Sequence, residues 1–423
     1  MASTRWPRKP ARLQPGSPPP LLLISFDGFR ADYLQRFPMP NLELLYSQGV
    51  LVEQLTNVFV TKTFPNHFTM VTGLYAESHG IVASNMYDPV SHKTFRTSTR
   101  DPMWWNKAQP LWISAQDSGY KTAAMMWPGS DITYGNRTAT HFLRYKPWRD
   151  LSAATGECDE LDAGERGGRD VHVDDNVGHV MSELKRLGLW GRVNLLVTSD
   201  HGMAQCAADR LIRLDDCLHP DNYTLVDVTP VAAIIPLADP QVVFALLDKC
   251  HAHMTAYLKQ EIPDRLHYRN SERIPEIILV ADEGWTIVRQ GDQLPRLGDH
   301  GYDNTLPSMH PFFSAVGPSF RQGYRMSRLQ SVDIYPLMCH LLSVPPQPNN
   351  GTLAQARCLL SAETCWDVPR TIGLVVCVLL VLTTVTVLFK WLSQHRFSGP
   401  WPLPIHNLDC KDDDDDDVDS LLE

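Results

Sequence analysis

Two stretches of the chain share one form, a continuous apolar run that ends in an acidic residue followed closely by glycine. They are LLLISFDGF at residues 21–29 and VNLLVTSDHGM at residues 193–203. Continuous apolar runs of this length are typical of strands that are buried on both faces of a parallel sheet. In such sheets ligands gather at the carboxyl ends of the strands, and Asp27 and Asp200 would lie there.

Further segments extend this pattern. Residues 121–129 and 231–237 are predicted as a third and a fourth strand, and helical stretches fall between the strands at residues 41–48 and 173–187. Strands that alternate with helices predict an α/β domain. With 423 residues, of which 43% are apolar, the chain can bury a large core as one big domain or as two fused ones.

The segment at residues 372–389 is uncharged and mostly apolar, and its 18 residues are close to the length that spans hydrocarbon. A buried core helix is the alternative. Basic residues follow the segment closely while only Arg370 precedes it, so the positive-inside rule places the C-terminus in the cytosol. We therefore expect a single-pass type I protein of the cell membrane, with its bulk outside the cell.

Other features bear on this topology. Glycosylation sequons, each a weak signal alone, begin at Asn136, Asn222 and Asn350. Seven of the nine cysteines precede the span, which permits disulfides in an oxidising compartment. Residues 1–20 are basic and proline-rich and lack the apolar core of a signal peptide, so an incomplete or alternative N-terminus is expected. No basic stripe suggests a nucleic-acid polymer as a partner.

Residue types that bind metals occupy three turns that contain glycine: FDGF, SDHGM and GDHGYDN. They supply Asp27, Asp200, His201 and His300. Any one of these alone is more often a capping aspartate or a hydrogen-bonded histidine than a ligand. Two of the turns follow predicted strands and a third comes later in the chain, and together they favour a zinc site.

The stretch TKTFPNHFTMVTG places Thr63 directly before Phe-Pro, where a helical run begins. A hydroxyl at a helix N-terminus is usually only an N-cap. Beside a metal ion, however, the pKa of the same alcohol falls, and it becomes an alkoxide nucleophile that attacks phosphorus. The N–H groups of the helix would then help to hold the phosphate oxygens.

Together with NMYDPV, AMMWPGSD and VADEGWTI, these motifs resemble the ectonucleotide pyrophosphatase/phosphodiesterase family of the alkaline phosphatase superfamily, over about residues 21–391 apart from one interval. The resemblance implies an α/β fold like that of alkaline phosphatase, with a mostly parallel central sheet flanked by helices. It also implies a zinc-dependent phosphodiesterase with two zinc ions. Its substrates would be nucleotides or dinucleoside polyphosphates such as diadenosine triphosphate, cleaved through a threonine nucleophile and a nucleotidyl-enzyme intermediate.

The resemblance also implies roles for individual residues. Thr63 matches the nucleophile, and His300 matches one ligand of the second zinc. The ligands of the first zinc are matched by Asp27, Thr63, Asp200 and His201. Aromatic residues that flank the nucleotide base are matched by Phe64 and Tyr145. The cysteine pairs that match family disulfides are Cys217 with Cys250 and Cys358 with Cys365.

Two departures separate the chain from the family pattern. Ser84, with Asn85 one position later, stands where the family has an asparagine that holds a phosphate oxygen, which predicts weaker stabilisation of the transition state. The second departure is the interval at residues 146–171. There the family carries a further strand and a Pro-Asp-x-x-x-His motif that supplies two ligands of the second zinc. The interval, which contains Cys158, has no apolar run of four residues and is predicted to be a loop.

The octet HVDDNVGH at residues 172–179 copies the spacing of the missing motif with Asp175 and His179. This spacing places the two side chains on one face of a helix. An apolar stripe marks the opposite face, and its members are Val173, Val177, Val180, Leu184 and Leu187. We therefore predict that Asp175 and His179 face solvent and that the second zinc lacks two ligands.

Two functions follow as hypotheses. The first is an ecto-phosphodiesterase that uses two zinc ions and Thr63. The alternative is a catalytically impaired or silent surface glycoprotein that keeps a single zinc. The expected organisation is a disordered segment at 1–20, a catalytic domain at 21–345, a juxtamembrane stalk at 346–370, a transmembrane helix at 371–392 and a cytosolic acidic tail at 393–423, which contains six consecutive aspartates.

Overall fold

The structure is a computed structural model that describes residues 16–144, 167–289, 297–363 and 368–395. The chain divides into two units, Met1–Thr364 and Cys365–Glu423. The first unit holds the sheets and their flanking helices, and the second holds one long helix.

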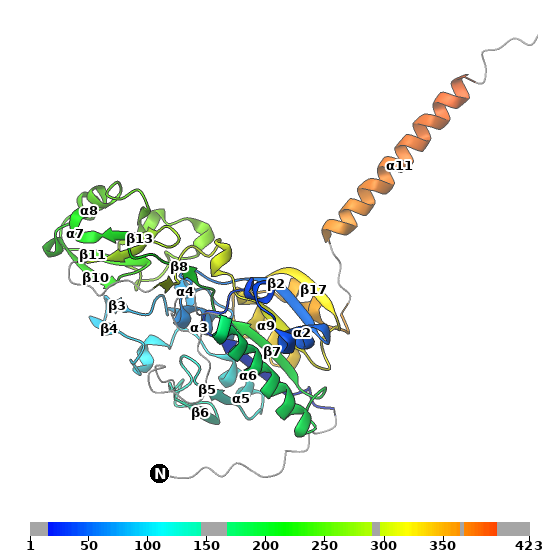
Figure 1. Ribbon diagram of the computed structural model, residues 1–423, viewed down its shortest axis with the longest axis horizontal. Helices are drawn as coiled ribbons and strands as arrows, with labels where there is room; N and C mark the ends of the chain where they lie inside the picture. The colour runs from blue at the N-terminus through cyan, green and yellow to red at the C-terminus, as the bar shows by residue number, and fades with distance from the viewer. Residues whose placement is uncertain (1–15, 145–166, 290–296, 364–367, 396–423) are drawn as a thin grey trace, which may run out of the picture. The chain divides into compact units, whose positions relative to one another are not determined.

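A five-stranded sheet lies at the centre of the first unit (Figure 1). One strand, β16, is antiparallel to both of its neighbours, and the other four strands run in one direction, so the prediction of a mostly parallel sheet is confirmed. The strand order is β1 (Leu21–Phe26), β7 (Asn194–Ser199), β16 (Phe313–Val316), β2 (Val50–Thr56) and β17 (Tyr324–Gln330).

The two apolar runs that end in an aspartate form β1 and β7. These strands pair in parallel from Leu21 opposite Asn194 to Phe26 opposite Ser199. Because both strands end at the same rung of the ladder, the residues that follow them, Asp27 and Asp200, lie at one edge of the sheet. This placement agrees with the prediction.

The predicted third and fourth strands also form, but neither belongs to the central sheet. Part of the third is β5 (Ala123–Met125), which pairs with β6 (His141–Leu143) alone. The fourth, β11 (Val231–Pro236), lies in an antiparallel sheet whose order is β10 (Tyr223–Asp227), β11, β13 (Ile277–Ala281) and β12 (Met254–Leu258). An apolar run predicts that a strand is buried, but it does not predict which strand it pairs with. For this reason the sequence did not assign these two strands to their sheets.

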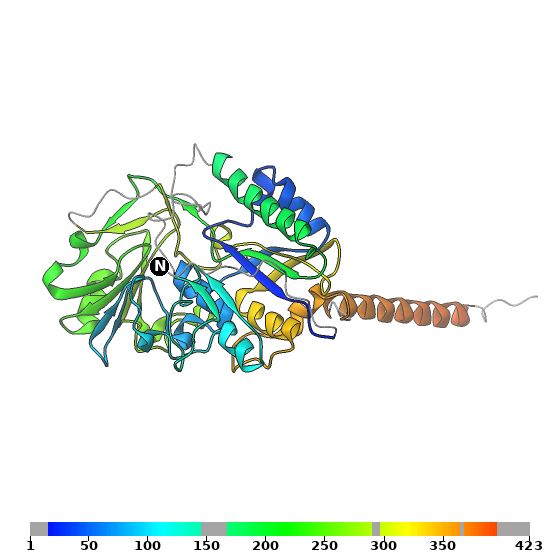
Figure 2. The same cartoon turned by 90° about the horizontal axis from the view of Figure 1, so that it is seen from below.

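Helices cover both faces of the central sheet, as Figure 2 shows. On one face lie α2 (Pro40–Ser47) and α6 (Gly167–Arg186), and on the other lie α3 (Thr63–Thr72) and α9 (Ile334–Leu342). Successive side chains of β7 pack alternately against the helices on one face of the sheet and those on the other. Leu195 and Val197 belong to the core of α2 and α6, whereas Leu196 belongs to the core of α3 and α9.

The helix that carries the octet buries one face and leaves the other in solvent. Its buried stripe includes Val173, Val177 and Met181, while Leu187 is 42% exposed. Asp175 and His179 are exposed, so the prediction that they face solvent is confirmed.

Asp174, in the same octet, has a structural role. It is 2% exposed, and its carboxylate accepts hydrogen bonds from the backbone N–H groups of Asn41 (3.1 Å) and Leu42 (2.8 Å) and from the Asn41 amide (2.9 Å). These N–H groups belong to the first turn of α2 and have no partner within the helix. Asp174 therefore fixes the start of α2 from across the helix pair.

The compact first unit continues past residue 345, where we expected a stalk to begin. Helix α10 (Leu353–Ala356) and the turn η8 (Arg357–Leu359) pack against it, and Ala356, Leu359 and Leu360 are buried in the same core as α9. Burial of these apolar side chains stabilises the packing of the segment against the rest of the first unit.

The second unit contains α11 (Val368–His395), whose stretch Val375–Gln394 has a mean hydropathy of 2.4. By length and composition this one helix can cross a membrane, so it is compatible with a single-pass protein.

Asp174→Ala leaves the two backbone N–H groups at the start of α2 without their acceptor. We expect the free energy of unfolding of the full chain in detergent to fall by about 1–3 kcal/mol. Urea unfolding followed by tryptophan fluorescence measures the change. The matched control is Asp175→Ala, which should stay within about 0.5 kcal/mol of the wild type because Asp175 is exposed. Equal losses in the two variants would contradict the capping role.

Candidate active site

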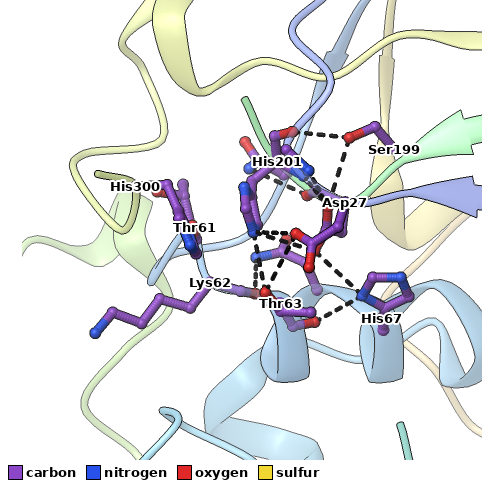
Figure 3. A network of polar contacts seen from close by, with 12 residues as sticks. Asp27, Thr61, Lys62, Thr63, His67, Ser199, His201 and His300 are labelled. Carbon is purple, nitrogen blue, oxygen red and sulfur yellow. Dashed lines mark hydrogen bonds and ion pairs between the residues drawn. The ribbon is translucent and has the colours of Figure 1, made fainter. Parts of the chain in front are cut away.

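Four segments meet at the carboxyl end of the central sheet (Figure 3). Asp27 follows β1, Asp200 and His201 follow β7, and Thr63 begins α3. His300 lies in the turn after β15 (Gly298–Asp299). Segments that are far apart in the sequence thus bring together the residues that the motifs singled out.

Their polar atoms converge on one point. The Nε2 atom of His201 lies 3.2 Å from Asp27 Oδ1 and 3.1 Å from Asp200 Oδ2. It also lies 3.2 Å from the Thr63 hydroxyl, which is 3.4 Å from Asp27 Oδ1. One ligand atom each from Asp27, Asp200 and His201 lies within 4.8 Å of the others.

A backbone carbonyl fixes the orientation of the His201 ring. The Nδ1 atom lies 2.8 Å from the carbonyl oxygen of Gly202, which can only accept, so Nδ1 carries the hydrogen. In the neutral ring, Nε2 then presents its lone pair to two carboxylates. This arrangement is unfavourable unless a proton or a metal ion lies between them.

The electrostatics of the buried site favour a positive charge at this point. Burial alone would lower the pKa of His201, but the carboxylates of Asp200 and Asp27 outweigh burial and raise the pKa to about 10. Burial would raise the pKa of Asp200, yet His201 and His67 hold it well below its usual range. Asp200 Oδ2 is buried and accepts no hydrogen bond of good geometry, although both histidines lie within 3.2 Å. The residues therefore fit a divalent cation with oxygen and nitrogen ligands.

His300 stacks on His201, with ring centroids 3.6 Å apart and planes at 11°. Its Nδ1 atom donates to the carbonyl oxygen of Thr61 (3.0 Å), which leaves Nε2 as the free ring nitrogen. Burial and the neighbouring His201 hold the pKa of His300 well below its usual range, so the ring is neutral and suited to bind a metal. Across the described ranges, however, no second cluster of metal-binding side chains forms around it.

The residues expected at the substrate are more dispersed. Phe64 is only 2% exposed because its ring packs against Phe95 and Trp105, so it offers little free surface to a base. Ser84 is half-buried. The amide of Asn85 is used at both ends, because it donates to Asp227 (2.8 Å) and accepts from Arg96 (2.9 Å). Tyr145 and residues 146–166 lie outside the described residues. The rest of the interval at 146–171, which we predicted to be a loop, forms the start of α6 (Gly167–Arg186), so that part of the prediction is wrong.

The cysteine predictions have separate outcomes. Cys217 and Cys250 form a disulfide, as predicted. Cys358 is also disulfide-bonded, and its expected partner Cys365 lies outside the described residues. Cys158 lies outside them as well.

Two further residues of the TKTFPNH stretch, which the motifs did not predict, lie beside Thr63. Lys62 donates to the carbonyl oxygen of Thr229 (2.7 Å) and pairs with Asp227 (3.3 Å). His67, one turn further along α3, contacts both Thr63 and Asp200. In Figure 3 they lie on opposite sides of Thr63. Residues four apart on a helix lie on the same face, so the spacing of Thr63 and His67 could have indicated that the two side chains are neighbours.

The chain matches the family model described as type I phosphodiesterase / nucleotide pyrophosphatase over residues 21–163 and 168–303. The chain belongs to this family. Its members are nucleotide pyrophosphatase/phosphodiesterase hydrolases that generally depend on metal ions, in keeping with the cluster at Asp27, Asp200 and His201.

Relatives and solved structures agree with this assignment. Bis(5'-adenosyl)-triphosphatase of Bos taurus is 49% identical over 95% of this chain and 94% of its own length. The human protein of the same name is 46% identical over 94% of both chains. Murine family member 5, solved as an inactive threonine-to-alanine variant with AMP, has a TM-score of 0.77 and 41% identity. It covers 81% of this chain and 100% of its own.

Zinc chloride, added to chelator-treated protein, should raise the stability of the wild type because only the folded state gathers the three ligands. At about 100 times the dissociation constant, the expected gain is ~2.7 kcal/mol. Asp200→Ala should lose this gain, and thermal unfolding with and without zinc measures it. Asp175→Ala, altered at an exposed carboxylate, should respond as the wild type does. A full zinc response in Asp200→Ala would exclude this site.

Proposed function

We propose that the chain hydrolyses dinucleoside polyphosphates such as diadenosine triphosphate, with Thr63 as the nucleophile. The observation that carries the proposal is the position of the Thr63 hydroxyl. It lies at the start of α3, 3.2 Å from His201 Nε2 and 3.4 Å from Asp27 Oδ1. The hydroxyl therefore lies beside two metal-binding groups and at a helix N-terminus, where an activated nucleophile could meet a phosphate group.

In the proposed mechanism Thr63 Oγ1 attacks the phosphorus of one nucleotidyl group. The hydroxyl proton passes to the carboxylate of Asp27, which already faces the hydroxyl. The bond from Oγ1 to phosphorus forms, the anhydride bond breaks, and the remaining nucleoside diphosphate leaves. Water then cleaves the nucleotidyl ester, which releases the nucleoside monophosphate and restores the hydroxyl.

The helix and the cation site have distinct parts in this scheme. No side chain caps the N-terminus of α3, so its first N–H groups are available to phosphate oxygens. A zinc ion held by Asp27, Thr63, Asp200 and His201 would lower the pKa of the hydroxyl and stabilise charge on the phosphate. Ser84 would donate to a phosphate oxygen, with Asn85 held beside it by Asp227 and Arg96.

The relatives support the substrate class. Two are named for hydrolysis of bis(5'-adenosyl) triphosphate, and the solved relative binds AMP, the nucleotidyl product of such a reaction. That relative is inactive with one threonine replaced by alanine, which supports a threonine nucleophile here. Tyr145 and Phe64 would flank the base in this proposal.

The proposed setting is the cell surface. Family members are ectoenzymes, and α11 would serve as the span with the acidic tail in the cytosol. Asn136, Asn222 and Asn350 are exposed, as glycan attachment requires.

One observation favours a second candidate, a catalytically impaired chain with a single zinc. His300 is neutral and oriented, yet the part of the chain that the structure describes offers it no carboxylate and histidine to complete a second site. Two metal ions stabilise the attacking and the leaving oxygens of an in-line displacement. Loss of one would slow turnover by orders of magnitude and leave nucleotide binding possible.

Thr63→Ala should abolish hydrolysis of diadenosine triphosphate, because no other hydroxyl at the site occupies this position. We expect kcat to fall by at least about 10³-fold, whereas Thr63→Ser, which keeps the hydroxyl, should retain measurable turnover. Chromatographic detection of AMP release measures both. Equal rates for Thr63→Ala and the wild type would exclude Thr63 as the nucleophile.

The number of bound zinc ions separates the two candidates. Native mass spectrometry of the wild type, paired with the same assay, should give two zinc ions and robust turnover for the intact enzyme. One zinc ion with little or no turnover supports the impaired chain, because His300 alone does not hold a second ion.

A further inference from the structure

His67 lies one turn after Thr63 on α3 and is 7% exposed. Its Nδ1 atom is 2.9 Å from the carbonyl oxygen of Thr63 and 3.2 Å from Asp200 Oδ2 (Figure 3). The carbonyl oxygen can only accept, so Nδ1 carries a hydrogen. One N–H group therefore faces both the peptide of the nucleophile and a carboxylate of the cation site.

The two oxygens of Asp200 have different surroundings. Oδ1 accepts from the backbone N–H groups of Gly28 (3.1 Å) and His201 (2.9 Å). Among the described residues, Oδ2 lies 3.2 Å from His67 Nδ1 and 3.1 Å from His201 Nε2, and neither contact has good hydrogen-bond geometry. Backbone donors thus hold the carboxylate through Oδ1, and the N–H group of His67 lies against Oδ2.

Trp127 holds the His67 ring in turn. Its indole N–H donates to the backbone carbonyl of His67 (3.1 Å), and the two rings meet edge to face at 4.8 Å and 80°. The indole therefore restrains both the backbone and the ring of His67. A ring restrained in this way cannot follow a carboxylate that moves, so it keeps the carboxylate in place.

We propose that His67 is a positioning residue, which holds Asp200 Oδ2 and the Thr63 peptide in the geometry that binds the metal ion and presents the nucleophile. The inference rests on the proposed function. His67 does not act as a ligand through Nδ1, because that atom carries a hydrogen. The contact is independent of the charge of the ring, since Nδ1–H is present in the cation and in this neutral tautomer alike.

Two near-isosteric variants separate positioning from simple space filling. The amide nitrogen of asparagine is attached to Cγ, as Nδ1 is in histidine, so His67→Asn keeps a donor near the original place. The amide nitrogen of glutamine corresponds to Nε2, so His67→Gln moves the donor away from Asp200. His67→Ala removes it.

The experiment measures the zinc dissociation constant of each full-length variant by competition with a chromogenic chelator, and kcat and KM with diadenosine triphosphate. We expect His67→Asn to bind zinc within about threefold of the wild type, and His67→Gln and His67→Ala to bind about 10–100-fold more weakly. The value of kcat should fall little for His67→Asn and more for His67→Gln and His67→Ala, whereas KM should change little. Asp175→Ala, on the far face of α6, should match the wild type.

Several outcomes would overturn the inference. If His67→Gln and His67→Asn bind zinc equally tightly, His67 only fills space. The same conclusion holds if both variants lose zinc affinity to the same extent. A wild type that binds no zinc would overturn the inference together with the proposed metal site. A wild type that shows the expected zinc affinities but hydrolyses nothing would refute the proposed function alone, because zinc affinity is read without turnover. If His67→Ala does not fold, the asparagine and glutamine variants still decide.

Discussion

The parallel pairing of β1 with β7 is the constraint on which the site depends. Parallel strands that end at the same rung bring their following residues side by side, and here these residues are Asp27 and Asp200. Four flanking helices bury the two faces of the sheet and keep this register, because a slip by one residue would turn each buried side chain of β7 to the opposite face. The position of the carboxylates is thus a consequence of core packing far from them.

A pair of buried or half-buried carboxylates needs positive charge nearby, and the histidines around them share one arrangement. His67, His201 and His300 each place Nδ1 against a backbone carbonyl, of Thr63, Gly202 and Thr61 respectively. The backbone therefore selects the tautomer in all three rings and decides which nitrogen remains for other partners. The orientation of these three rings thus follows from the main chain.

Much of this organisation was predictable from the sequence, for physical reasons that also explain the failures. Apolar runs that end in Asp-Gly or Ser-Asp-His-Gly predicted β1, β7 and the meeting of their aspartates, because burial and strand direction are local properties. The period of the α6 stripe likewise predicted that Asp175 and His179 face solvent.

Contacts between distant segments were not predictable in this way. The assignment of β5 and β11 to other sheets depends on which strands they pair with, and periodicity does not report pairing. Lys62 meets Asp227 across 165 positions of the chain, and no local pattern marks either residue. The packing of residues 353–360 onto the core was missed because a short amphipathic segment and a polar stalk have similar compositions.

The interval at residues 146–171 matters less for the cluster of Asp27, Asp200 and His201 than for a second cation site at His300. Asp27 follows β1, Asp200 and His201 follow β7, and Thr63 begins α3, so all four residues lie in described parts of the chain outside that interval. The central sheet and α3 therefore position the candidate cation cluster and the Thr63 hydroxyl. His300 is different, because its stacking on His201 and its bond to Thr61 orient the ring without supplying further ligands. The described residues thus bring together the cation cluster and the Thr63 hydroxyl, and a second cation site at His300 would depend on further ligands.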